Sequence, residues 1–374
     1  MTNAMIASSP SRNHGFSLIE VMVGLVIGLI GLLVVIQVVT VWGGRTQTTT
    51  AGNDTQISGS LGMFVLERDI KQAGLGFGTA TANVMGCMVK ADEPIVSSFR
   101  LVPVEIVSGA VGVPQAISVL HGDSAFFSAA QIFQSSTSTT KTSKNGYGFQ
   151  GGHFMVVAAD GSLTNFCGMG APQVHAMVKI NSVAVAPPLA VITTFHDAGA
   201  LAGTTFSAGN LYDLGAAPER NLWEIDASTP GRPVLRWSNT LTSTTIFFEA
   251  AEGIVNLQAQ YGYDANSDNM IQDTEWVATL PANWNGTKVR AIRVAILARS
   301  KQYEKTPVTT VAPAPSWSTN TASCNATTLG CSFLMTDIGG PTDTNLNDTT
   351  DWRHYRYRVY EKVIPLPNMI YGTQ

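Results

Sequence analysis

The chain has 374 residues, which is enough for one large domain or two smaller ones, each with a substantial core. Charged residues make up only 13% of it and the formal net charge is −4, which argues against a dominant nucleic-acid-binding surface. The low charge and the abundance of Gly, Ser and Thr favour an extracytoplasmic β-rich protein over a cytosolic helical enzyme.

A long apolar run dominates the N-terminal region. Residues 21–42 carry no formal charge, and a helix of this length spans about 33 Å, enough to cross the hydrocarbon core of a bilayer. An ordinary secretory signal has a shorter apolar core followed by a small-residue cleavage site, and no convincing site of that kind follows Trp42. We therefore predict a membrane-spanning helix that stays in the mature chain.

Glu20 is the one acidic residue at the start of this apolar run. An unpaired carboxylate inside a membrane costs several kcal/mol, so Glu20 needs a dedicated partner. Cleavage between Gly15 and Phe16 would create an α-amine at the same end of the helix, able to pair with Glu20 within one subunit or between neighbours. The alternative is an uncleaved signal anchor whose Glu20 lies among the lipid headgroups.

The segment GFSLIE at residues 15–20 resembles the class III signal peptide of type IV pilins and type II secretion pseudopilins. The resemblance implies a leader at residues 1–15, cleavage after Gly15 by a prepilin peptidase, N-methylation of Phe16, and a role for Glu20 in aligning each subunit with its neighbour. It also implies that the helix at residues 16–42 is a single inner-membrane span that later contacts major and minor pilins. The remaining chain would then lie in the periplasm and finally on the pilus at the cell surface.

Residues 43–75 are predicted to continue the helix. The Gly- and Thr-rich stretch after Trp42 indicates either a frayed helix or a break. Beyond it, Glu67 and Lys71 can pair at i,i+4, and Gly74 offers a C-cap. The apolar residues that recur with helical period are Ile57, Leu61, Phe64 and Val65. We therefore expect a long N-terminal helix that packs on a globular domain.

The wording LERDIKQAGLGF at residues 66–77 resembles PilW-type minor pilins, the larger subunits found near pilus tips. From residue 76 to residue 374 the pattern changes to short apolar runs divided by Gly, Pro, Asn and Asp, which is typical of strands and turns. The predicted fold class is therefore α+β: a long, pilin-like N-terminal helix on a large β-rich domain, with one or two subdomains.

Strands are predicted at residues 154–158, 191–195, 222–225, 234–237, 254–261 and 289–298. Residues 128–146 are rich in Ser, Thr and Lys and are predicted to form a surface loop. Alternation over residues 355–360 predicts a half-buried strand, which resembles the closing strand of PilW-type proteins.

The four cysteines include no CxxC pair and have no histidine cluster nearby, so disulfides are expected in preference to zinc. Cys324 and Cys331 flank a short loop, whose closure is geometrically easy, and are predicted to form a disulfide. Cys87 and Cys167 then pair by elimination. The alternative for each pair is buried free thiols.

Residues 264–275 match the ligand spacing of a calcium loop. The predicted ligands are the side chains of Asp264, Asn266 and Asp268, the carbonyl of Met270, an oxygen of Gln272 directly or through water, and a bidentate Glu275. Asn269 replaces the usual glycine, although asparagine tolerates the left-handed region better than most residues. We predict a structural calcium ion. The alternative is an Asx-rich turn that caps itself.

A second cluster, at residues 343–351, has no glutamate at the twelfth position and is predicted to be a solvated loop. The sequence contains no HExxH, GxSxG or phosphate-binding glycine loop, so no enzyme active site is predicted.

The predicted function is that of a PilW-like minor pilin that helps to start or cap a type IV pilus. One alternative is a pseudopilin at the tip of a type II secretion machine. Another is a pilus-delivered adhesin that uses the Ser/Thr-rich loop or the calcium loop to contact a surface.

Overall fold

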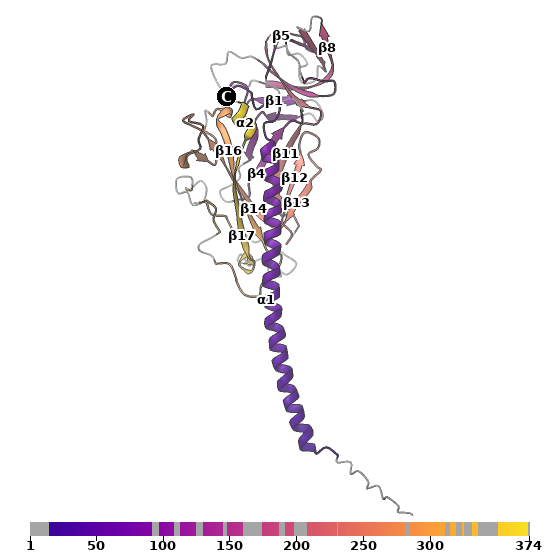
Figure 1. Ribbon diagram of the computed structural model, residues 1–374, viewed down its shortest axis with the longest axis vertical. Coiled ribbons are helices and arrows are strands. Elements are labelled where there is room, and N and C mark those ends of the chain that lie inside the picture. Colours follow the sequence, from indigo (N-terminus) through magenta and orange to yellow (C-terminus); the bar gives the residue numbers. More distant parts are fainter. Residues whose placement is uncertain are drawn as a thin grey trace, which may run out of the picture. The chain divides into compact units, whose positions relative to one another are not determined.

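The structure is a computed structural model that divides into two compact units, Met1–Ala51 and Gly52–Gln374 (Figure 1). It describes residues 15–91, 97–107, 113–124, 130–144, 148–159, 174–186, 191–197, 208–229, 231–281, 284–310, 315–318, 324, 331–335 and 351–372. The predicted leader up to residue 14, Cys167 and almost all of the 343–351 cluster lie outside these residues.

Helix α1 (Leu18–Gln72) contributes residues to both units. Its backbone is helical through the Gly- and Thr-rich stretch at residues 43–51, so of the two alternatives for this stretch, a frayed helix or a break, the break is excluded. Each glycine in a helix costs only about 1 kcal/mol relative to alanine, and propagating an existing helix is far easier than starting one. The helix that is already formed on either side is therefore extended across this stretch.

Of the four residues in the predicted apolar pattern of α1, Val65 is partly buried and packs against the main core. Ile57, Leu61 and Phe64 are exposed, whereas Leu66 and Ile70 have no exposed surface. The buried face also contains Gly59, Gly62 and Met63.

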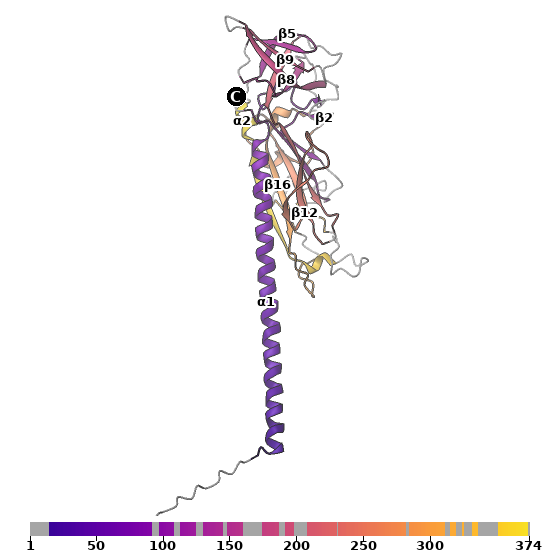
Figure 2. The same cartoon turned by 90° about the vertical axis from the view of Figure 1, so that its right-hand side faces the viewer.

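Glycines allow this close approach. A side chain at Gly59 would collide with the ring of Tyr360, and one at Gly62 would press against Leu235 and Ala251. The Tyr360 hydroxyl donates to the carbonyl oxygens of Thr55 and Gln56 at 3.3 and 3.2 Å. The helix thus lies against strands through its smallest residues, and Figure 2 shows these turns beside β12 and β16.

The predicted features at the end of α1 are present. Lys71 pairs with Glu67 at 2.8 Å, and Gly74 has the positive φ of +82° that a helix C-cap requires. Asn368 donates to the last carbonyl oxygens of the helix, those of Gln72 and Ala73, both at 3.1 Å.

Two antiparallel sheets enclose the main core together with α1. The five-stranded sheet has the order β13 (Phe248–Glu252), β12 (Val234–Asn239), β11 (Glu219–Asp226), β4 (Ala116–His121), β3 (Val104–Val107). The four-stranded sheet has the order β15 (Trp276–Val277), β14 (Ile254–Tyr263), β16 (Val289–Arg299), β17 (Tyr357–Pro365). Short helices flank it: 3-10 helices Asp273–Glu275, Gly286–Lys288 and Asp351–His354, and α2 (Pro367–Gly372).

A third sheet closes on itself (Figure 1). Its ring contains β8 (Val174–Ala186), β7 (Phe154–Ala159), β10 (Gly209–Gly215), β5 (Gln131–Ser136), β6 (Thr140–Ser143) and β9 (Val191–His196), which pairs again with β8. β1 (Met88–Ala91) and β2 (Ser97–Arg100) extend it at β8. Alternate residues divide between two cores: Val156 and Ala158 join the main core, whereas Met155 and Val157 fill the ring.

The strand predictions are confirmed in β7, β9, β11, β12, β14, β16 and β17. The surface loop predicted at residues 128–146 is wrong, because β5 and β6 form a hairpin there. Its polar sequence conceals inward-facing residues: Phe133 belongs to the core of the ring, and Lys141 is fully buried. The Lys141 ammonium donates to the carbonyl oxygen of Thr137 at 2.6 Å, and burial lowers the pKa of Lys141 to about 8.

The expected Cys324–Cys331 disulfide is present. It lies beside a small core that contains Trp317, Phe333 and Leu297. Cys87 is also disulfide-bonded. Its pairing with Cys167 stays a prediction, because Cys167 lies outside the described residues.

Candidate functional site

The N-terminal end of α1 carries a helix cap built around Glu20. Ser17 precedes the first helical residue, and its backbone N–H donates to Oε2 of Glu20 at 3.2 Å. The Val21 N–H in turn donates to the Ser17 carbonyl oxygen at 3.2 Å. Ser17 and Glu20 have the S-x-x-E spacing of a capping box. The S-x-x-E spacing that indicates this cap is present in the sequence.

The cap gives Glu20 a defined position. The N-terminal end of a helix carries a partial positive charge, because the N–H groups of the first turn have no partner within the helix and point out of that end. A carboxylate held there is stabilised, and Glu20 lies only one turn from Phe16, whose α-amine would be free after the predicted cleavage. The structure therefore places the acidic group at the end of the helix where that amine would form.

The first 23 residues of α1, Leu18–Thr40, form a segment that is long and apolar enough to cross a membrane. Every side chain from Phe16 to Thr40 is exposed. The Thr40 hydroxyl donates back to the carbonyl oxygens of Ile36 and Gln37 at 3.0 and 2.9 Å, so this polar group is satisfied inside the helix. A helix that is apolar on all sides requires lipid or other apolar helices around it.

Glycines open one part of this surface to close approach. Gly24, Gly28 and Gly31 have no atom of the described chain near the position that a side chain would occupy. Two helices approach most closely where such small residues face each other. This open surface is compatible with the expectation that the helix contacts the helices of other pilins.

The predicted calcium loop connects β14 to the 3-10 helix Asp273–Glu275. Asp264 and Glu275 are buried. The carboxylate of Asp264 accepts the backbone N–H groups of Asp268 and Asn269, both at 3.1 Å. Glu275 accepts those of Ala265 and Gln272, both at 2.9 Å.

Asn269 has a φ of +64°, the left-handed conformation that the glycine of a calcium loop supplies. The Asp268 carboxylate accepts the Met270 N–H at 2.8 Å, which lowers the pKa of Asp268. The Arg290 guanidinium lies beside the loop and donates to Oδ1 of Asn269 at 3.1 Å. These internal bonds are those of an Asx-rich turn, so calcium binding stays a prediction.

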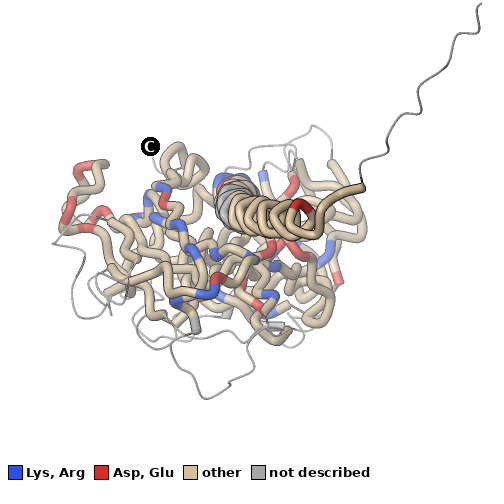
Figure 3. Tube along the Cα trace, turned by 90° about the horizontal axis from the view of Figure 1, so that it is seen from below, with Lys and Arg blue, Asp and Glu red and all other residues tan. Residues whose placement is uncertain are grey.

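Acidic and basic residues alternate along the described part of the β-rich unit, with neither kind gathered in one region of the trace (Figure 3). Several of them form local pairs: Arg236 with Glu224 and Asp226, and Arg356 with Glu304. Such pairing neutralises charge locally and does not build a field of one sign.

Two family models match the chain. Residues 10–36 match the prokaryotic N-terminal methylation motif, and residues 224–368 match the Type IV Pilus-assembly protein W. Among solved structures, a type IV-like pilin from Thermus thermophilus is similar, with 11% identity and a TM-score of 0.24 over 58% of this chain and 86% of that chain. No curated protein matches the chain.

The two family matches fall on the two parts of the chain that carry the site and the closing sheet. The methylation motif covers the Ser17–Glu20 cap and the start of the apolar helix. The second match runs from β11 through β17 and into α2. Both features occur in one polypeptide, and the two matches together support a PilW-type type IV pilin.

Proposed function

We propose that this chain is a minor pilin that takes part in starting type IV pilus assembly and occupies the tip of the filament. The observation that carries the proposal is the apolar helix Leu18–Thr40, which begins two residues after the proposed methylation site Phe16 and bears one carboxylate, Glu20, in its first turn. Before assembly this helix anchors the chain in the inner membrane, with the β-rich unit in the periplasm. Afterwards it packs among the helices of other pilins.

The proposed first step is cleavage between Gly15 and Phe16 by a prepilin peptidase, followed by N-methylation of Phe16. Cleavage creates a positive α-amine, which is the partner that a carboxylate at a membrane boundary needs. In the described chain Glu20 accepts the Ser17 N–H through Oε2. A carboxylate has about four acceptor positions, so it can hold this cap and still bind the amine of a neighbouring subunit.

The second step is transfer of the helix from lipid to the filament. The same Leu, Ile and Val side chains that lipid surrounds in the bilayer can be buried against other helices. Formation of the Glu20–amine pair in apolar surroundings selects the axial register, because a neighbour in another register leaves both charges unpaired. A subunit that initiates the filament enters before all others, and it therefore stays at the tip as later subunits are added behind it.

The test begins with the N-terminus. Protein recovered from membranes is analysed by intact mass and N-terminal sequencing, with and without the prepilin peptidase. We expect a chain that begins at methylated Phe16 and whose formation depends on the peptidase. An uncut chain, or a cut beyond Trp42, would refute the proposal.

Assembly is tested separately with Glu20→Gln, which keeps the size of the side chain and removes its charge. We expect normal processing but few or no surface pili in cells that carry this variant. Glu67→Gln is the matched control, because Glu67 lies on the same helix and pairs with Lys71 and Lys362 inside the β-rich unit. Normal piliation with a defect in protein secretion would instead favour the pseudopilin alternative, and piliation with lost adhesion would favour the adhesin alternative.

We also propose that the loop at residues 264–275 binds a structural calcium ion. The supporting observation is Asn269, which adopts the left-handed conformation required at the sixth loop position. Calcium should raise the unfolding temperature of the full chain in detergent, and Glu275→Gln should abolish the increase. Asp273→Asn, at a position that supplies no ligand, should retain it. If calcium leaves the unfolding temperature of the parent protein unchanged, the loop is the self-capping turn.

A further inference from the structure

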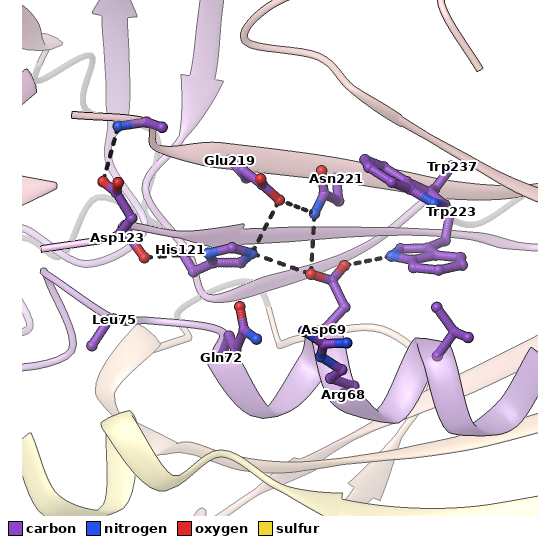
Figure 4. Close-up of a pocket in the computed structure, with 13 residues that line it drawn as sticks. Arg68, Asp69, Gln72, Leu75, His121, Asp123, Glu219, Asn221, Trp223 and Trp237 are labelled. Carbon is purple, nitrogen blue, oxygen red and sulfur yellow. Dashed lines mark hydrogen bonds and ion pairs between the residues drawn. The ribbon is translucent and has the colours of Figure 1, made fainter. Parts of the chain in front are cut away.

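A cavity of about 400 Å³ lies in the β-rich unit, between the last turns of α1 and the five-stranded sheet (Figure 4). Three side chains that can ligate metal meet at its wall. Asp69 comes from α1, His121 is the last residue of β4, and Glu219 is the first residue of β11. β4 and β11 pair so that His121 lies directly opposite Glu219. The pairing register, rather than proximity in sequence, creates the cluster.

The three ligand atoms lie close enough to share one ion. Nε2 of His121 is 3.2 Å from Oδ1 of Asp69 and 3.7 Å from Oε2 of Glu219. One potential ligand atom from each of the three residues lies within 4.8 Å of the others. Among the residues that the structure describes, this is the one group of three or more His, Cys, Asp or Glu side chains with that geometry. A single nitrogen therefore faces two carboxylates.

The other ring nitrogen of His121 indicates which form of imidazole suits this site. Nδ1 lies 3.3 Å from the carbonyl oxygen of Gly122, so it must carry a proton to avoid repulsion between two acceptors. Without metal, Nε2 donates a hydrogen bond to Oδ1 of Asp69, and a bound cation would take the place of that proton on the Nε2 electron pair. A backbone carbonyl that holds one ring nitrogen while the other binds metal is a recurrent arrangement in metal sites.

The carboxylates are themselves oriented by neighbouring donors. Asn221 Nδ2 donates to Oδ1 of Asp69 at 3.1 Å and to Oε2 of Glu219 at 2.9 Å. Trp223 Nε1 donates to the second oxygen, Oδ2, of Asp69 at 2.5 Å. In Figure 4 all of these groups converge on the same point beside the helix. Hydrogen bonds of this type keep ligating carboxylates in position and are a common second layer around bound metal ions.

Charge and access also favour a cation. A cation that replaces the Nε2 proton of His121 would face two carboxylates, those of Asp69 and Glu219. The side chains of Asp69 and His121 are only 11% and 7% exposed, so water screens these charges poorly. The Glu219 side chain is 41% exposed, which leaves an entrance from solvent on that side. A divalent cation would neutralise the cluster.

We propose that Asp69, His121 and Glu219 bind a divalent transition-metal cation, with remaining coordination positions open to water in the cavity. One imidazole nitrogen and two carboxylate oxygens suit zinc-type ions better than calcium, which takes oxygen ligands only. The ion would link α1 to β4 and β11 and so fasten the end of the helix to the sheet. This site is separate from the proposed calcium loop and from the N-terminal assembly site.

Zinc binding to the full chain tests the proposal. The protein is purified in detergent without a histidine tag, stripped with a chelator, and titrated with Zn²⁺ by calorimetry. Co²⁺ is added in parallel, because its visible absorption reports nitrogen and oxygen ligation directly. We expect one equivalent of each metal, a Zn²⁺-dependent increase in unfolding temperature, and at least a tenfold loss of affinity in His121→Gln and Glu219→Gln.

Controls distinguish this site from others. Glu249→Gln changes an exposed glutamate that pairs with Arg232 outside the cavity, and it should bind zinc like the parent protein. Asp268→Asn in the calcium loop should also leave zinc affinity unchanged. If His121→Gln lowers the unfolding temperature without metal, Glu219→Gln decides the result, because its side chain is partly exposed. Absence of saturable binding, equal affinity in Glu219→Gln and parent, or loss of binding in Asp268→Asn would overturn the proposal.

Discussion

Leu66 offers a quantitative test of how α1 packs in the β-rich unit. Its side chain has no exposed surface and lies in the main core. Replacing a buried leucine by alanine removes apolar contacts and leaves a cavity, at a cost of about 2–5 kcal/mol that depends on how far the surroundings collapse. Collapse is restricted here, because the Tyr360 hydroxyl binds the helix backbone and Lys362 binds Glu67 at 2.7 Å. We therefore expect a loss of about 4 kcal/mol for Leu66→Ala.

The measurement is urea unfolding of a fragment that begins at Gly52, followed by tryptophan fluorescence. Leu66→Ala should lower the midpoint without changing the slope, which reports a change in stability alone. Phe64→Ala is the matched control two residues away, where the side chain is 62% exposed, so we expect less than about 0.5 kcal/mol. If Phe64→Ala costs as much as Leu66→Ala, the helix packs through the face predicted from its apolar period and our description of the interface is refuted.

Three further predictions concern stability. His175 is fully buried, and burial lowers its pKa from 6.5 to about 4, so the unfolded state binds more protons between these values. The free energy of unfolding should fall by about 3 kcal/mol as the pH drops from 6.5 to 4. Urea unfolding of His175→Leu at a series of pH values should lack this decrease. If the variant loses as much stability between pH 6.5 and 4 as the parent protein, the prediction is contradicted. Removing the Cys324–Cys331 bridge, whose cysteines are seven positions apart, should cost about 2–3 kcal/mol in the chain-entropy account, measured by comparing the unfolding of a Cys324→Ser, Cys331→Ser double variant with that of the parent without reductant. Gly59→Ala should destabilise by about 1–3 kcal/mol because its side chain meets the Tyr360 ring, whereas Gly52→Ala, in open space on the same helix, should be neutral or stabilising; equal effects would exclude the close packing.

Local patterns in the sequence were sufficient for much of this protein. The apolar run and the GFSLIE segment identified the helix and the pilin resemblance, and seven strands followed from alternation and turn residues. The Cys324–Cys331 disulfide followed from a short loop. The i,i+4 pair of Glu67 and Lys71 and the cap at Gly74 depend on the helix itself. Each of these features is determined by residues that are close together along the chain.

The helix face that packs depended on the tertiary structure. The apolar period favoured Ile57, Leu61, Phe64 and Val65. Of these only Val65 packs against the core, and the interface also uses Gly59 and Leu66, because glycine allows strands to approach the helix backbone closely. Close packing at a small residue therefore decided which side of the helix faces the strands, and the position of the larger apolar side chains did not. Ile57, Leu61 and Phe64 stay exposed on the other side of the helix and do not contribute to the core.

The polar hairpin β5–β6 and the cavity cluster were also beyond local patterns. Lys141 is buried because the sheet closes around it, and composition gives no sign of that closure. Asp69, His121 and Glu219 are separated by 52 and 98 positions along the sequence and meet through the register of β4 on β11 together with the seating of α1. Strand register is set by the packing of whole faces, so the sequence alone determined the elements and the N-terminal chemistry, whereas the fold decided which distant side chains share a site.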